Sequence, residues 1–141
     1  MRRGHRGHTI LELIIVLMMT AVVLAIAVPR TVRMLDRISV HAAASDVAAT
    51  LGSARTLAMA ARLAVAVDVD TASGVLRVRR GPEALFSRNV GHAHGVRIKA
   101  TRDSLAFGPR GLGLGAANLS IVVSRRAVVE TVFVSRLGRV R

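Results

Sequence analysis

The sequence predicts an α+β fold in which a long N-terminal helix packs on an antiparallel β-sheet. Two observations predict the helix. The stretch Ile10–Val28 is apolar except for Glu12 and Thr20, and the stretch from Thr31 to about Leu63 is rich in alanine, leucine and methionine. A third observation predicts the sheet, because beyond residue 63 the apolar residues begin to alternate with polar ones. About 110 residues follow the apolar stretch, enough for one modest core.

The second half of the predicted helix carries one apolar stripe. Its members recur at helical spacing and are Val47, Leu51, Ala54, Ala58 and Ala61. Arg55 and Arg62 lie off this stripe, and Gly52 is the one glycine in the segment. We therefore expect one helix of about fifty residues, apolar on all sides in its first half and amphipathic in its second.

Alternating segments then predict the strands. Ala64–Asp70 and Val75–Arg80 flank the turn Thr71–Gly74 and predict a hairpin. The further predicted strands are Val96–Thr101, Ser104–Phe107, Leu119–Ser124 and Val128–Ser135, separated by glycine-rich loops. We expect three segments in all: a basic segment over 1–7, an apolar helix over 8–29 that is long enough to cross a membrane, and a globular domain over 30–141.

Composition limits the chemistry and indicates the kind of partner. The chain has no cysteine, so it has neither disulfides nor thiolate metal sites. Lysine and arginine total 21 against 8 acids, a net charge of +13. That charge favours an acidic partner, an anionic membrane surface or a nucleic acid, although arginine codons of a GC-rich genome on solvated faces also explain it. Three phenylalanines are the whole aromatic content, which argues against base stacking.

The N-terminal segment has three competing explanations. The basic residues before the apolar run predict insertion with the C-terminal body outside the cytoplasm. A cleaved signal peptide could end near Ala25-Ile26-Ala27, and a plain signal anchor also fits the apolar run. Neither explains Glu12, because a carboxylate in an apolar span costs roughly 2.5–3.5 kcal/mol on insertion scales.

The third explanation accounts for the acid. The residues Gly7-His8-Thr9-Ile10-Leu11-Glu12 resemble the processing site of type IV pilins and type II secretion pseudopilins. The resemblance implies that residues 1–7 are a prepilin leader, which a prepilin peptidase removes after Gly7, and that residues 8–29 form a transmembrane and filament-core helix. It further implies methylation of the new N-terminus at His8 and a filament-assembly role for Glu12. It also implies a helix kink at Pro29. The family usually has Phe or Met where this chain has His8. A buried carboxylate needs a partner, and the α-amine of a neighbouring subunit would supply one.

The C-terminal part is similar to the GspH/FimT group of minor pilins and pseudopilins. Its members often carry a Phe-x-x-x-Gly turn and a Gly-Arg-x-Arg tail, here Phe107 with Gly111 and the run Gly138–Arg141. The resemblance implies a subunit of a type II secretion pseudopilus or a type IV pilus, held in the bacterial inner membrane with its domain periplasmic or extracytoplasmic. Its partners would be other pilins or pseudopilins and the prepilin peptidase.

Three further motifs could form a metal, cation or phosphate site, but each is better explained as ordinary structure. His92 and His94 could reach one metal, yet no third ligand lies nearby and we expect a flexible loop. Asp68 and Asp70 share a strand face but provide too few oxygens for a cation. The glycine-rich run 111–115 is followed by a strand and reads as a linker. We expect no enzyme activity, no cofactor and no metal.

A cluster of arginines near the end of the chain supports an alternative function. The cluster comprises Arg125, Arg126, Arg136, Arg139 and Arg141. On an extended tail, residues 139 and 141 project to the same side and suit phosphates. In FimT-like proteins such a tail is associated with DNA capture, so the alternative is a DNA-binding minor pilin used in natural transformation. A solvated tail, or contact with an acidic partner pilin, also remains open.

Overall fold

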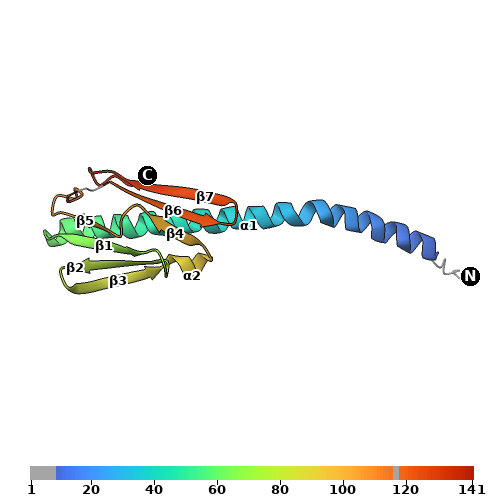
Figure 1. Ribbon diagram of the computed structural model, residues 1–141, viewed down its shortest axis with the longest axis horizontal. Helices are drawn as coiled ribbons and strands as arrows, with labels where there is room; N and C mark the ends of the chain where they lie inside the picture. The colour runs from blue at the N-terminus through green and yellow to red at the C-terminus, as the bar shows by residue number, and fades with distance from the viewer. Residues whose placement is uncertain (1–8, 116–117) are drawn as a thin grey trace, which may run out of the picture. The chain divides into compact units, whose positions relative to one another are not determined.

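The computed structural model describes residues 9–115 and 118–141 (Figure 1). The chain divides into two compact units, residues 1–35 and residues 36–141, which are considered separately below. The helix α1, Ile10–Ala61, contributes to both units. Its 52 residues confirm the predicted single long helix.

In the first unit, α1 begins after Thr9 and continues through Pro29. Thr9 caps the helix, because its Oγ1 accepts a hydrogen bond from the backbone N–H of Glu12 at 3.2 Å. The hydroxyl groups of Thr20 and Thr31 donate to carbonyl oxygens one turn earlier, at 2.8 and 3.1 Å. These hydroxyls therefore need no partner outside the helix.

The second unit contains two antiparallel sheets and a short helix. A four-stranded sheet has the order β3-β2-β1-β5, and a three-stranded sheet has the order β4-β6-β7. The strands are β1 Val65–Asp70, β2 Val75–Arg80, β3 Glu83–Asn89, β4 Arg97–Ala100, β5 Ser104–Phe107, β6 Leu119–Arg125 and β7 Val128–Val134. The helix α2, Val90–His94, connects the two sheets between β3 and β4.

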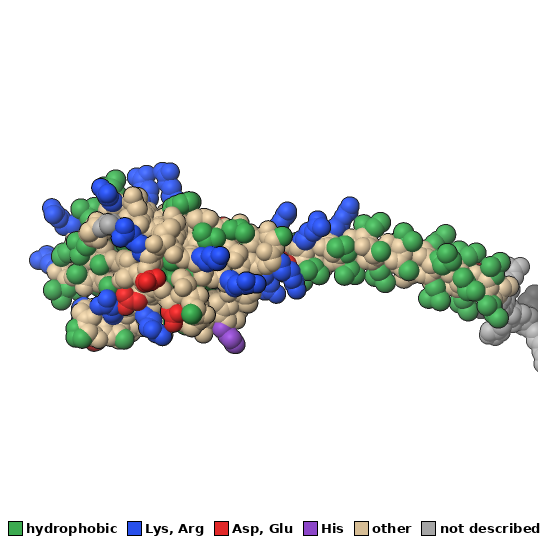
Figure 2. All heavy atoms as spheres, in the orientation of Figure 1, with side chains coloured by type: hydrophobic (Ala, Val, Ile, Leu, Met, Phe, Trp, Pro, Cys, Tyr) green, Lys and Arg blue, Asp and Glu red, His purple; other side chains and the backbone are tan. Residues whose placement is uncertain are grey.

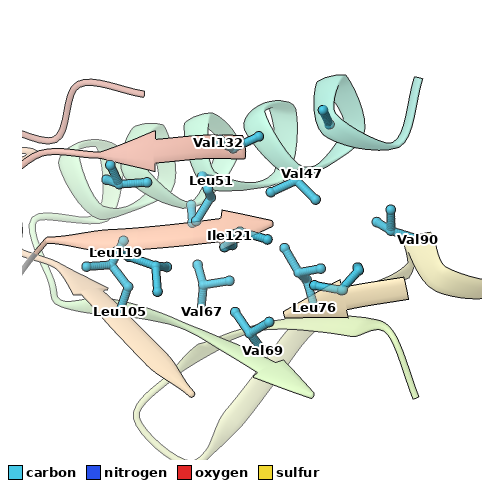
Figure 3. Packing of buried hydrophobic residues seen from close by; sticks show 14 of the residues in the cluster. Val47, Leu51, Val67, Val69, Leu76, Val90, Leu105, Leu119, Ile121 and Val132 are labelled. Carbon is cyan, nitrogen blue, oxygen red and sulfur yellow. The ribbon is translucent and has the colours of Figure 1, made fainter. Parts of the chain in front are cut away.

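One hydrophobic core joins the helix to both sheets (Figure 3). Val47 and Leu51 of α1 are fully buried and pack with Ile121 of the three-stranded sheet and Val67 of the four-stranded sheet. The predicted stripe is buried at residues 47, 51, 54 and 58, but Ala61 is exposed because the helix ends there. The α+β prediction, with the second half of the helix covered by antiparallel strands, is confirmed.

The structure corrects three details. The expected single sheet is two sheets, because β4 pairs with β6 while β5 returns to pair with β1. Strand β3 was not predicted. It is an edge strand with no fully buried residue, so it lacks apolar alternation. The segment expected as a flexible loop around Gly91 is the helix α2, capped by Asn89, whose Oδ1 accepts from the N–H of His92 at 3.0 Å.

Candidate functional site

The apolar part of α1 is the first candidate site. Every described side chain from residue 9 to residue 35 is exposed, and Figure 2 shows hydrophobic side chains along this segment. Glu12 is the one ionisable residue between Thr9 and Pro29. The most apolar 18-residue window of the helix has a mean hydropathy of 2.8, so α1 is long and apolar enough to cross a membrane. A surface of this kind calls for lipid or for other apolar helices around it.

Glu12 lies in the first turn of this helix, and Thr9 stands three residues before it. The pair therefore matches the Thr-x-x-Glu pattern of a capping box, with the Thr9 half of that pattern formed. A carboxylate in the first turn also interacts favourably with the helix dipole. Two other residues of the predicted processing site, Gly7 and His8, lie outside the described residues.

The predicted arginine cluster separates into two groups. Arg125 and Arg126 lie at the turn between β6 and β7, where both bind Asp36 of α1 at 2.9 Å. The Asp36 side chain is only 4% exposed. Arg125 also donates to Ser39 Oγ at 3.1 Å and to the carbonyl of His94 at 2.8 Å. These two guanidinium groups are therefore engaged in holding the hairpin turn on the helix.

Strand β7 leads away from this turn toward the C-terminus (Figure 1). Arg136, Arg139 and Arg141 follow its last residue, Val134, and so lie about 20 Å from the turn by the rise of a strand. All three are exposed, and none of the described acidic side chains forms an ion pair with them. Most acids of this unit are engaged elsewhere, as in the pairs of Asp68 with Arg79 and Glu83 with Arg80. Figure 2 accordingly shows many basic and few acidic side chains on the visible face.

The last residues are paired with β7, whereas the sequence analysis left open a solvated tail. The backbone N–H and C=O of Phe133 exchange hydrogen bonds with Arg141 at 2.8 and 2.9 Å. Val140 forms a bridge with Val134 and packs against the core. The turn between them includes Gly138, with φ +70°, whose N–H donates to the Ser135 carbonyl at 2.9 Å.

This paired segment and the side chains around it form an open surface pocket of about 310 Å³, lined by Phe133, Ser135, Leu137, Arg139 and Arg141. Arg139 and Arg141 therefore face one side, as two-residue spacing on an extended segment requires. The Phe133 side chain is 56% exposed and the Leu137 side chain 67% exposed. The sequence analysis did not identify Phe133 as a site residue, because it considered the phenylalanines only as candidates for base stacking. The alternation of β7 could have found it, since that alternation places Phe133 on the outer face of the strand.

The two halves of the C-terminal motif meet in space. A Cβ atom at Gly138 would lie 2.2 Å from the carbonyl oxygen of Gly111. Arg55 Nε donates to the same oxygen at 3.0 Å. Phe107, the first residue of the motif, is fully buried, and a bridge joins it to Gly113. The glycine-rich run is therefore a hydrogen-bonded packing element here and not merely a linker.

The remaining chemistry-bearing residues make structural contacts. His94 Nε2 lies 2.8 Å from Asp46 Oδ2, while His92 is exposed, so the two imidazoles of this helix point apart. Partial burial alone would raise the pKa of Asp68. The hydrogen bonds from Arg79 and Ser104 and the nearby guanidinium charges outweigh burial and hold that pKa below its ordinary value. Asp70 accepts from the N–H of Ala72 at 3.1 Å and so closes the β1–β2 turn.

Comparison with known structures defines the class of fold. A long helix whose second half packs on antiparallel sheets is the fold of type IV pilins, and solved pilin structures superpose on this chain. The minor pilin FimU of Pseudomonas aeruginosa superposes with a TM-score of 0.65 at 18% identity, covering 77% of this chain and 90% of FimU. A second crystal form of FimU gives a TM-score of 0.60 at 16% identity, covering 72% and 90%. No protein-family model matches the chain, and no curated protein is significantly similar to it in sequence.

The chain thus has the type IV pilin fold, and the minor-pilin resemblance seen in its motifs is confirmed at the level of the fold. The apolar segment of α1 is exposed and long enough to cross a membrane, and the fold of the chain is that of solved type IV pilins.

Proposed function

We propose that this protein is a minor structural subunit of a type IV pilus or a type II secretion pseudopilus. It would be made as a precursor, cut after Gly7 and methylated at His8. It would reside in the inner membrane with its second unit outside the cytoplasm until it enters a filament. The proposal assigns it no enzyme activity.

One observation carries the proposal. The first half of α1 exposes apolar side chains on every side and holds a single acid, Glu12, in its first turn. Such a helix suits two environments in succession, lipid before assembly and a bundle of apolar helices from other filament subunits after it. Pro29 removes one backbone hydrogen bond from the helix and so provides the place for the predicted kink.

Substitution of Glu12 tests the assembly role. We expect Glu12→Val to keep cleavage and membrane insertion, because it removes a charge from an apolar segment. Incorporation into filaments should fall at least tenfold, measured by co-purification with the partner pilins. Val16→Glu, with the acid moved about one turn along the helix, is the control and should not restore incorporation when combined with Glu12→Val.

Processing is tested independently. Intact mass of the membrane-extracted protein should give a chain beginning at His8. A chain beginning at Val28 would identify an ordinary signal peptide and remove the filament proposal. Normal assembly of Glu12→Val would leave the pilin fold standing but refute the role of the acid.

A second candidate function is DNA binding during natural transformation. The observation that favours it is the exposed group Arg136, Arg139 and Arg141, which lacks acidic partners among the described residues. Arg125 and Arg126 support it less, because Asp36 already binds them. Guanidinium groups held on a paired segment would contact phosphates and leave the base sequence unread.

The salt dependence of DNA affinity tests this candidate. Each phosphate contact adds roughly 0.9 to the slope of log affinity against log salt, so Arg139→Gln with Arg141→Gln should flatten that slope by about two. The matched control, Arg88→Gln with Arg102→Gln, removes the same charge from exposed positions elsewhere and should change the slope little. If the affinity for DNA does not change with salt concentration, phosphate binding by these arginines is refuted.

A further inference from the structure

The pocket at the end of β7 combines two kinds of wall. Phe133 and Leu137 contribute exposed apolar side chains, and Arg139 and Arg141 contribute guanidinium groups. We call this site the Phe133 pocket. Its volume of about 310 Å³ falls at the lower end of the range for small ligand sites, enough for one or two side chains of a partner.

The Phe133 pocket is pre-formed by backbone pairing. Arg141 exchanges two hydrogen bonds with Phe133, and the Arg139 carbonyl accepts from the N–H of Ser135 at 3.0 Å. Val140, between the two arginines, packs against the core. These contacts fix both arginine backbones beside the aromatic ring, so binding requires little ordering of the chain, and ordering is a main cost of association.

The chemistry of the walls selects the ligand. An apolar group is needed to cover Phe133 and Leu137, and an anion close to it is needed for the guanidinium groups. A row of phosphates would satisfy the arginines but leave Leu137 in water. A carboxylate beside an apolar side chain satisfies both, and arginine binds carboxylates with two parallel hydrogen bonds. A second copy of this chain is disfavoured by its net charge of +13.

We propose that the Phe133 pocket is a docking site for an acidic segment of a partner protein, one that inserts an apolar side chain between Phe133 and Leu137 and places carboxylates on Arg139 and Arg141. The inference rests on the proposed function only in taking that partner to be a neighbouring filament subunit. Binding at the pocket itself requires neither cleavage at Gly7 nor assembly.

The test uses the full chain in phosphatidylcholine nanodiscs, with empty nanodiscs as the baseline. The probe is a short fluorescent peptide in which glutamate alternates with leucine. One control peptide replaces leucine with serine at the same charge, and another replaces glutamate with glutamine. A fluorescent DNA duplex is the fourth probe. Fluorescence anisotropy gives each dissociation constant.

We expect the glutamate–leucine peptide to bind at least tenfold more tightly than either control peptide. Phe133→Ser should weaken it about tenfold, the loss of one buried aromatic contact. Arg139→Gln with Arg141→Gln should weaken it at least tenfold, as expected for hydrogen bonds between charged groups. Both changes lie on exposed side chains, so circular dichroism should be unaltered.

Matched controls separate the pocket from general charge and apolarity. Leu63→Ser removes another exposed apolar side chain, and Arg88→Gln with Arg102→Gln removes two exposed arginines. Neither should change peptide affinity more than twofold. The proposal is overturned if Phe133→Ser leaves the affinity for the peptide unchanged. It is also overturned if the chain binds the DNA duplex through Arg139 and Arg141 but does not bind the peptide. Failure of filament assembly would leave these results unaffected.

Discussion

Replacing Gly138 by alanine tests how the end of the chain is locked to the core. Gly138 has φ +70°, a left-handed conformation that costs an alanine roughly 1 kcal/mol. The new Cβ would also lie 2.2 Å from the carbonyl oxygen of Gly111, so the backbone must move. That movement disturbs the hydrogen bond from Arg55 to the same oxygen, worth about 1 kcal/mol. Moving the packed backbone adds roughly 1 kcal/mol more, so we expect a total loss of about 3 kcal/mol in the free energy of unfolding.

Urea unfolding of the full chain in nanodiscs, followed by circular dichroism, measures this loss. The chain has no tryptophan or tyrosine, so fluorescence is a poor probe. Gly81→Ala is the matched control, because Gly81 has φ +57° and open space beyond its chain neighbours where a Cβ would lie, and it should lose only about 1 kcal/mol. Gly52→Ala lies in a helix with free space and should gain up to about 1 kcal/mol. Equal losses for Gly138→Ala and Gly81→Ala would refute the packing argument.

Two further predictions concern acids of the second unit. Asp36→Asn should reduce the free energy of unfolding by about 1–3 kcal/mol, because Arg125 and Arg126 lose a buried charged acceptor. Urea unfolding measures this loss, and an unchanged midpoint would contradict it. Asp68 has a lowered pKa, so its ion pair with Arg79 stabilises the fold above the ordinary aspartate pKa, and this contribution is lost as the pH falls through the lowered value. Asp68→Asn removes this titrating group. Its thermal unfolding midpoint should therefore fall less between pH 7 and acidic pH than that of the unsubstituted chain. If both midpoints fall in parallel with pH, the stabilising role of the Asp68 carboxylate is refuted.

The arginine cluster shows the limit of reasoning from composition. From the sequence, the five arginines could not be told apart, because each is a cation near the end of a basic chain. The fold gives Arg125 and Arg126 an acid, Asp36, that lies about ninety positions earlier in the chain. It gives Arg139 and Arg141 no acid among the described residues, and Phe133 as a neighbour. Which cations remain available for a ligand depends on these distant pairings.

Local spacing was enough for the helix and most of the strands. A helix repeats every 3.6 residues and a strand every two, so the buried stripe of α1 and the alternation of β1, β2, β4, β5, β6 and β7 can be read from neighbouring residues. The apolar segment with Glu12 was equally visible, because hydropathy is a property of the run itself. The exposed edge strand β3 and the short helix α2 bury too little to leave such a pattern.

The sequence by itself therefore determined the long helix, its apolar half with one acid, and the antiparallel character of the domain. The tertiary structure alone decided that the strands divide into two sheets, that the chain end pairs with β7, and that Gly111 lies against Gly138. The physical reason is the range of the interactions. Periodicity records which face of an element is covered, but the partner that covers it is selected by packing and hydrogen bonding between residues far apart in the chain.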